Sequence, residues 1–132
     1  MNEISFDMIG GTPVVHVKIW SPTKKVYRSM FLTLDTGAAT TTISKDILHI
    51  LGYDTQSKKK IRIITASGVE FADEVTLDKL MIAGFELTDV KTHAFTFPQE
   101  CLSDGVVGIN VLSYFDIFVS FKRKILGFTL TG

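Results

Sequence analysis

The sequence predicts an all-β fold, either a barrel or a sandwich, with one or two short helices. Short runs of β-branched and aromatic residues alternate with turn residues along most of the 132-residue chain, which is the pattern of such folds. Residues 14–20 alternate apolar and polar side chains, so one face of this segment is expected to be buried. A hydrophobic fraction of 45% indicates a filled core, and the length suits a single domain spanning residues 1–132.

Glycine and proline turns separate the strands expected in the first half. We expect strands over residues 4–9, 14–20 and 26–34, because the breaks between them contain Gly10-Gly11 and Pro22. The third strand runs directly into Asp35-Thr36-Gly37.

Two short segments are expected to be helical. The first begins after Ser44, which can serve as the N-cap, and Gly52 can end it. An apolar stripe of Ile47, Leu48, Ile50 and Leu51 lies between these two residues. The second helix is expected over residues 110–115.

The second half of the chain is expected to form strands joined by tight turns. Ala83-Gly84 lies between two strands, as in a hairpin, and residues 65–68 form another turn. The last two strands form a closing hairpin. The expected strands cover residues 61–64, 69–71, 75–82, 85–97, 117–121 and 125–130.

Charge and length exclude several function classes. Fourteen basic residues balance fourteen acidic ones, which gives no reason to expect nucleic acid or an anionic membrane as a partner. No apolar run reaches the length needed to cross a bilayer, and acidic residues interrupt the amino terminus where a secretory signal would be apolar. We therefore expect a cytoplasmic protein without membrane contact.

Cysteine and histidine usage gives no sign of a metal or cofactor. Cys101 is the only cysteine, so an intrachain disulfide is impossible, and a reducing compartment fits. His16, His49 and His93 lie far apart without ligand spacing. The sequence predicts neither a metal site nor a cofactor.

Asp35 is the strongest candidate for chemistry. An apolar strand delivers this carboxylate into Thr36-Gly37, where a buried acid needs hydrogen-bond donors or a shared proton. The amides around Gly37 and the hydroxyl of Thr36 could supply the donors, and glycine lets the backbone pass close. The alternative interpretation is a plain turn between two strands.

Two blocks in order favour the catalytic interpretation. The first is Leu32 to Ala38, and the second is Val106-Val107-Gly108-Ile109-Asn110-Val111-Leu112, about seventy residues later. With them the sequence resembles the retropepsin-like aspartic peptidases. The resemblance implies a closed β-barrel-like acid protease fold, in which the strand of Val106 and Val107 passes beside the Asp35 loop.

The resemblance also implies a role for each site residue. Asp35, Thr36 and Gly37 would form the catalytic turn, with Thr36 hydrogen-bonding into a partner chain and Gly37 directing amides toward the carboxylate. Ala38 would line the cleft floor. Val107 would line a substrate pocket, although core packing is as good an interpretation of this valine. The flap that closes over the substrate would have its tip at Ala66, Ser67 and Gly68.

This chemistry needs two carboxylates, and the chain carries one such motif. Asp54-Thr55 is followed by Gln56 in place of glycine, and Asp104-Gly105 lacks the hydroxyl residue. We therefore expect a twofold homodimer in which two Asp35 carboxylates activate water to hydrolyse a peptide or protein substrate. The alternative function is a dimeric peptide-binding domain with little or no turnover.

Overall fold

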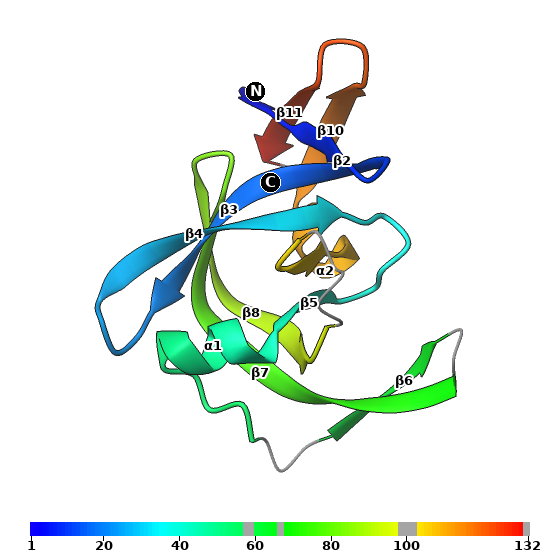
Figure 1. The fold of residues 1–132 in the computed structure, drawn as a ribbon. Helices are drawn as coiled ribbons and strands as arrows, with labels where there is room; N and C mark the ends of the chain where they lie inside the picture. Colours follow the sequence, from blue (N-terminus) through cyan, green and yellow to red (C-terminus); the bar gives the residue numbers. More distant parts are fainter. Residues whose placement is uncertain (57–59, 66–67, 98–102, 131–132) are drawn as a thin grey trace.

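The computed structural model describes residues 1–56, 60–65, 68–97 and 103–130, with only the backbone of Thr65 placed (Figure 1). Six strands close into a ring, because β3 pairs with β7 as well as with β4. This ring confirms the predicted all-β, barrel-like fold. Its strands, in order around the ring, are β3 (Thr12–Ser21), β4 (Val26–Leu34), β9 (Gly105–Val107), β5 (Thr41–Ser44), β8 (Phe85–Phe95) and β7 (Gly68–Ile82).

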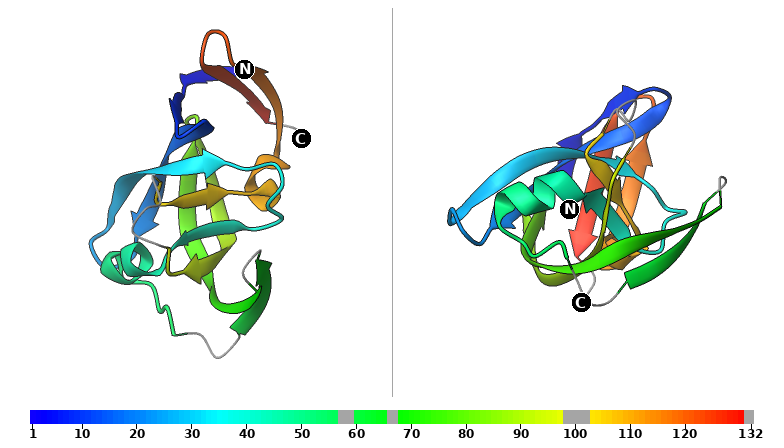
Figure 2. Two further views of the ribbon diagram at one scale, coloured as in Figure 1. Left: turned by 45° about the vertical axis from the view of Figure 1, so that its right-hand side comes forward. Right: turned by 60° about the horizontal axis from the view of Figure 1, so that its bottom comes forward.

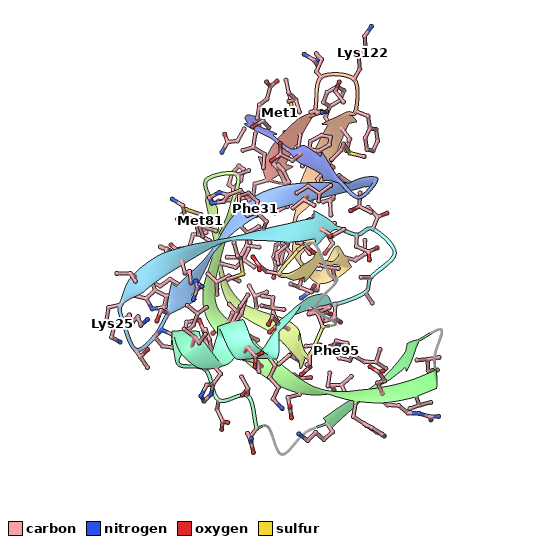
Figure 3. The ribbon with its side chains drawn as sticks, viewed as in Figure 1. Met1, Lys25, Phe31, Met81, Phe95 and Lys122 are labelled. Carbon is pink, nitrogen blue, oxygen red and sulfur yellow. The ribbon has the colours of Figure 1, made fainter. Side chains whose placement is uncertain are left out.

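Apolar side chains fill the barrel (Figure 3). The alternation predicted over residues 14–20 is present, since Val15, Val17 and Ile19 are buried while His16 and Lys18 are exposed. Leu32, Leu80 and Ile82 from the neighbouring strands complete this side of the core. Burial of such side chains is the main stabilising term of the fold.

A hairpin extends from the barrel on the side where the loop after β4 also lies (Figures 1 and 2). It consists of β6 (Lys60–Thr65) and the first part of β7, paired from Lys60↔Asp73 to Thr65↔Gly68. From Asp73 onward, β7 pairs with β8 instead. One continuous strand therefore belongs to both the hairpin and the barrel, whereas the sequence predicted separate strands over 69–71 and 75–82. That prediction was wrong because two consecutive acids, Asp73 and Glu74, look like a break in the sequence. In the structure the strand continues through them, since Asp73 is buried and paired with two lysines.

A second, three-stranded sheet has the order β1-β11-β10, which leaves β1 (Asn2–Ser5) and β10 (Phe115–Ser120) at its edges. Its central strand is β11 (Ile125–Leu130). The single strand predicted over residues 4–9 is two strands, because β2 (Asp7–Ile9) pairs with β3 of the barrel. The break falls at Phe6, whose side chain is buried and whose amide bonds the Lys124 carbonyl at 3.0 Å.

Both predicted helices are present and short. Helix α1 (Lys45–Leu51) ends at Gly52, whose φ of 101° is the left-handed conformation expected of a glycine C-cap. Ser44 occupies the N-cap position, although its side chain makes no capping hydrogen bond. Helix α2 covers only Ile109–Leu112, because β10 begins where the predicted helix was to end. Among the described residues, no helix is long and apolar enough to cross a membrane.

Candidate active site

Strand β4 carries Asp35 to the end of the barrel, where β9 runs beside it. Thr33 and Leu34 pair in parallel with Val106 and Val107, and the Asp35 amide donates to the Val107 carbonyl at 3.1 Å. The two motifs that lie about seventy residues apart in sequence are therefore adjacent in space, as the resemblance implied.

The turn supplies a backbone donor to the Asp35 carboxylate. The Gly37 amide donates to Oδ1 at 2.9 Å, and the Ala38 amide donates to the Asp35 carbonyl at 3.2 Å. A Cβ atom on Gly37 would lie 3.3 Å from the same Oδ1, so a larger residue would crowd the carboxylate. Asp35 is half-buried, while Thr36 and Gly37 are exposed. The carboxylate is thus fixed by the backbone and still open to solvent.

The residues after the turn are clamped by the segment that leads into α2. The Ile109 amide donates to the Ala38 carbonyl at 2.8 Å, and the Asn110 amide donates to the Ala39 carbonyl at 3.1 Å. Gly108 must be glycine here, because a Cβ atom would lie 2.8 Å from the Ala38 carbonyl oxygen and 2.9 Å from the Thr41 nitrogen, both backbone atoms. The segment that contains the second motif therefore holds the Asp35 loop in place.

A partly buried polar network completes this support. The Thr41 hydroxyl donates to Asn110 Oδ1 at 2.9 Å and accepts from the Gly108 amide at 3.0 Å. Asn110 Oδ1 also accepts the Thr41 amide, and Asn110 Nδ2 donates to the Lys91 carbonyl at 2.8 Å. Sequence reasoning noted Asn110 only as part of a motif and missed Thr41 altogether. The sequence carries no signal that singles out Thr41, since its neighbours Thr40 and Thr42 are the same residue type.

The β6–β7 hairpin occupies the place expected for the flap. It extends on the same side as the loop that holds Asp35 (Figures 1 and 2). Large apolar side chains are exposed on it, with Ile64 at 80% and Phe71 at 65% exposure. Gly68 begins β7 with a φ of 129°, and a Cβ atom there would meet no atom within 4 Å. Ala66 and Ser67, predicted to form the flap tip, lie outside the described residues.

Comparison with known proteins agrees with this geometry. The family model described as "Aspartyl protease" matches residues 28–111, more than half of the chain. The chain belongs to the aspartyl protease family. The matched region contains the Asp35 turn, the β6–β7 hairpin and the clamp at Gly108.

A solved structure places this family member among the retropepsin-like folds. The crystal structure of a retropepsin-like aspartic protease from Rickettsia conorii matches with a TM-score of 0.69 at 23% sequence identity. The match covers 94% of this chain and 87% of that protein. At this identity the likeness shows the shared fold. No curated protein matches the chain in sequence.

Two recesses of this aspartyl protease chain lie along the strands and the turn that hold Asp35. The first, of about 250 Å³, includes Thr33 and Val106, which lie on the strands that position Asp35. Its other lining residues are Ile9, Gly10, Thr12, Val14, Phe97, Ser103 and Gly105. The second, also about 250 Å³, is mainly apolar and includes Thr36 of the turn itself. Its other lining residues are Leu34, Ile109, Leu112, Ser113, Ile117 and Val119.

Val107 lies in the core and not in either recess. It is fully buried, so its side chain packs with the barrel interior, which is the second of the two interpretations weighed for it. Its half-buried neighbour Val106 is the residue that reaches the first recess. Ala38 is half-buried beside the turn, and its carbonyl is used by the clamp.

The histidines and acids of the described chain do not form a metal site. Within residues 1–56, 60–65, 68–97 and 103–130, no three His, Cys, Asp or Glu side chains gather where they could hold a metal ion. Cys101 lies outside these ranges.

Proposed function

We propose that this chain is an aspartic endopeptidase whose active site forms between two copies, each contributing Asp35. The observation that carries the proposal is the Asp35 turn: a solvent-accessible carboxylate, fixed by the Gly37 amide, at the end of a buried strand. Membership of the aspartyl protease family supports the reaction class.

The chemistry follows from two adjacent carboxylates. Like charges at contact distance do not both ionise readily, so the pair holds one proton. The ionised carboxylate takes a proton from water as the water oxygen attacks the scissile carbonyl, and the protonated one hydrogen-bonds the carbonyl oxygen. The carbon–nitrogen bond then breaks as the nitrogen receives a proton, which yields a carboxylic acid and an amine.

Asp104, which lies two residues before the second motif, is unsuited to be the second carboxylate. Its Oδ2 accepts the Phe31 amide at 3.1 Å. Phe31 lies four positions before Asp35, a distance of about 13 Å along an extended strand. The second carboxylate is therefore proposed to come from another chain.

The surface around the turn supports a twofold dimer. If two Asp35 residues meet on a symmetry axis, Thr36 and its neighbours lie inside the interface. The apolar recess beside Thr36 would then be covered by the partner, which removes exposed side chains such as Ile109 from water. Thr36 is proposed to hydrogen-bond across the axis to the partner's loop.

The substrate is proposed to be an extended peptide between the Asp35 turn and the β6–β7 hairpin. A strand-like peptide bonds through its main chain and places alternate side chains in recesses. The recess at Thr33 and Val106 would take one of these side chains. Ala38 is proposed to contact the peptide from below, and Ala66, Ser67 and Gly68 from above.

Replacing Asp35 with Asn tests the proposal, and the chain offers a close control. Asp54 makes the same local turn, since the Gln56 amide donates to its Oδ1 at 2.9 Å. Cleavage of a peptide library should fall by a factor of about 10² to 10⁴ in Asp35→Asn and stay unchanged in Asp54→Asn. Cleavage that survives in Asp35→Asn contradicts the mechanism. A wild-type dimer that binds peptides without cleaving them supports the alternative of a peptide-binding domain.

A further inference from the structure

The base of the β6–β7 hairpin is built around one buried acid. Asp73 is 3% exposed and lies where β7 stops pairing with β6 and continues with β8. Its two carboxylate oxygens are divided between two lysines: Lys45 Nζ lies 3.0 Å from Oδ2, and Lys60 Nζ contacts Oδ1.

The two lysines come from different parts of the active-site framework. Lys45 is the first residue of α1, directly after β5, the strand that follows the Asp35 loop. Lys60 is the first residue of β6, the other strand of the hairpin. The Asp73 carboxylate therefore joins both hairpin strands to the segment that leaves the catalytic turn.

Beside the base of the hairpin lies a recess of about 340 Å³, lined by Lys45, Glu70, Phe71, Asp73, Ala94, Phe95 and Thr96. Phe95, labelled in Figure 3, lies between α1 and the hairpin strand β7. Beside this open space, the Asp73–Lys45 ion pair joins the hairpin base to α1.

Of the three charged groups, Asp73, Lys45 and Lys60, the acid depends most on its partners. Burial by itself raises the pKa of Asp73, but the hydrogen bonds and charges of Lys60 and Lys45 outweigh burial and lower this pKa overall. The side chain of Lys45 is 33% exposed and that of Lys60 is 52% exposed, whereas the Asp73 side chain is 5% exposed. If the ion pairs break, water can solvate the two exposed lysines, but it cannot easily reach the buried Asp73 carboxylate.

We propose that Asp73 is a positioning residue that sets the angle of the β6–β7 hairpin over the Asp35 turn, acting through Lys45 and Lys60. The proposal rests on the proposed function in one respect, that the hairpin closes over the substrate. Asp73 touches neither substrate nor reacting atoms.

The test compares local opening of the hairpin with opening of the barrel. In Asp73→Asn, the amides of residues 60–64 and 69–72 should exchange hydrogen at least about tenfold faster, while those of residues 77–82 change less than about twofold. Glu86→Gln is the control, because Glu86 is exposed on β8 and pairs at 3.8 Å with Lys79, which lies on the barrel half of β7. It should leave hairpin exchange unchanged.

Lys45→Met keeps the proposal testable if Asp73→Asn does not fold, because Asp73 retains Lys60. It should accelerate hairpin exchange in the same direction by a smaller factor, and Lys45→Arg should restore the wild-type rate. Equal acceleration of hairpin and barrel amides would mean that the cluster only stabilises the fold, and no acceleration in either region would equally overturn the proposal.

Peptide cleavage separates this proposal from the proposed function. If Asp73 positions the hairpin of an active peptidase, Asp73→Asn should raise KM more than it lowers kcat. If hairpin exchange accelerates as stated but the wild-type protein cleaves no peptide, the positioning role stands and the peptidase proposal falls. If the wild-type protein cleaves peptides and hairpin exchange is unaffected by Asp73→Asn, the peptidase proposal stands and the positioning role falls.

Discussion

Replacing Thr41 with Val should weaken the support of the Asp35 loop without changing the size of the side chain. The substitution removes the hydroxyl that donates to Asn110 Oδ1 and accepts the Gly108 amide. Both groups are largely enclosed, and the Gly108 amide is left without this acceptor in a buried position. Two lost hydrogen bonds, one of which leaves a buried donor unpaired, should lower the free energy of unfolding by about 2 to 4 kcal/mol. The protein should still fold, because domains of this kind are stable by about 5 to 15 kcal/mol.

Thr42→Val is the matched control for this experiment. Thr42 is the next residue of the same strand, and its hydroxyl makes only a long bond of 3.3 Å to the Thr40 carbonyl. Urea unfolding followed by fluorescence of the single tryptophan, Trp20, measures the loss of stability, and peptide cleavage measures the effect on the site. Thr41→Val should lose both stability and kcat, while Thr42→Val should lose little of either. Equal effects of the two variants, or none in Thr41→Val, would refute the reasoning.

Three further predictions address the interface, the clamp and the pH dependence. Ile109→Asp places a charge beside Thr36, at a side chain that is 41% exposed, and should give a monomer by solution mass without peptidase activity; a dimer that still cleaves peptides would contradict the proposed interface. Gly108→Ala should lose activity and about 1 to 3 kcal/mol of stability through backbone crowding, whereas Gly127→Ala, which meets only the Met1 side chain, should lose far less; similar unfolding curves would contradict this difference. Burial lowers the pKa of His93 from 6.5 despite the nearby Glu74 charge, so the unfolded chain binds more protons. The stability that this histidine contributes is therefore present above pH 6.5 and lost as the pH falls through its folded pKa, and urea unfolding should show a smaller acid loss in His93→Gln.

The sequence was sufficient for the parts of the fold that depend on local pattern. Alternation over residues 14–20, the Ala83-Gly84 turn and the glycine end of α1 each have a local physical cause, and each is present. The Asp35 turn was also predictable, because an acid that follows an apolar strand and precedes glycine is unusual. The pairing of β4 with β9 could be predicted only from the second motif, about seventy residues away, and the family resemblance that it supports.

Features that depend on tertiary contacts were not predictable. Asp73 looked like a break between two strands, because the lysines that neutralise it lie 28 and 13 residues earlier in the chain. Phe6 looked like the middle of one strand, yet its burial divides that segment between two sheets. Thr41 gave no signal of its role because its partners, Gly108 and Asn110, are brought to it only by the fold.

The central claim is that two chains share one active site, and a mixing experiment tests it most directly. Wild-type protein and Asp35→Asn are combined in varying ratios, unfolded and refolded together, and assayed for peptide cleavage at constant total concentration. If each site needs an Asp35 from both chains, activity should fall with the square of the wild-type fraction, to about one quarter in an equal mixture. Activity that falls in direct proportion to the wild-type fraction would show that each chain carries its own complete site, and would contradict the account.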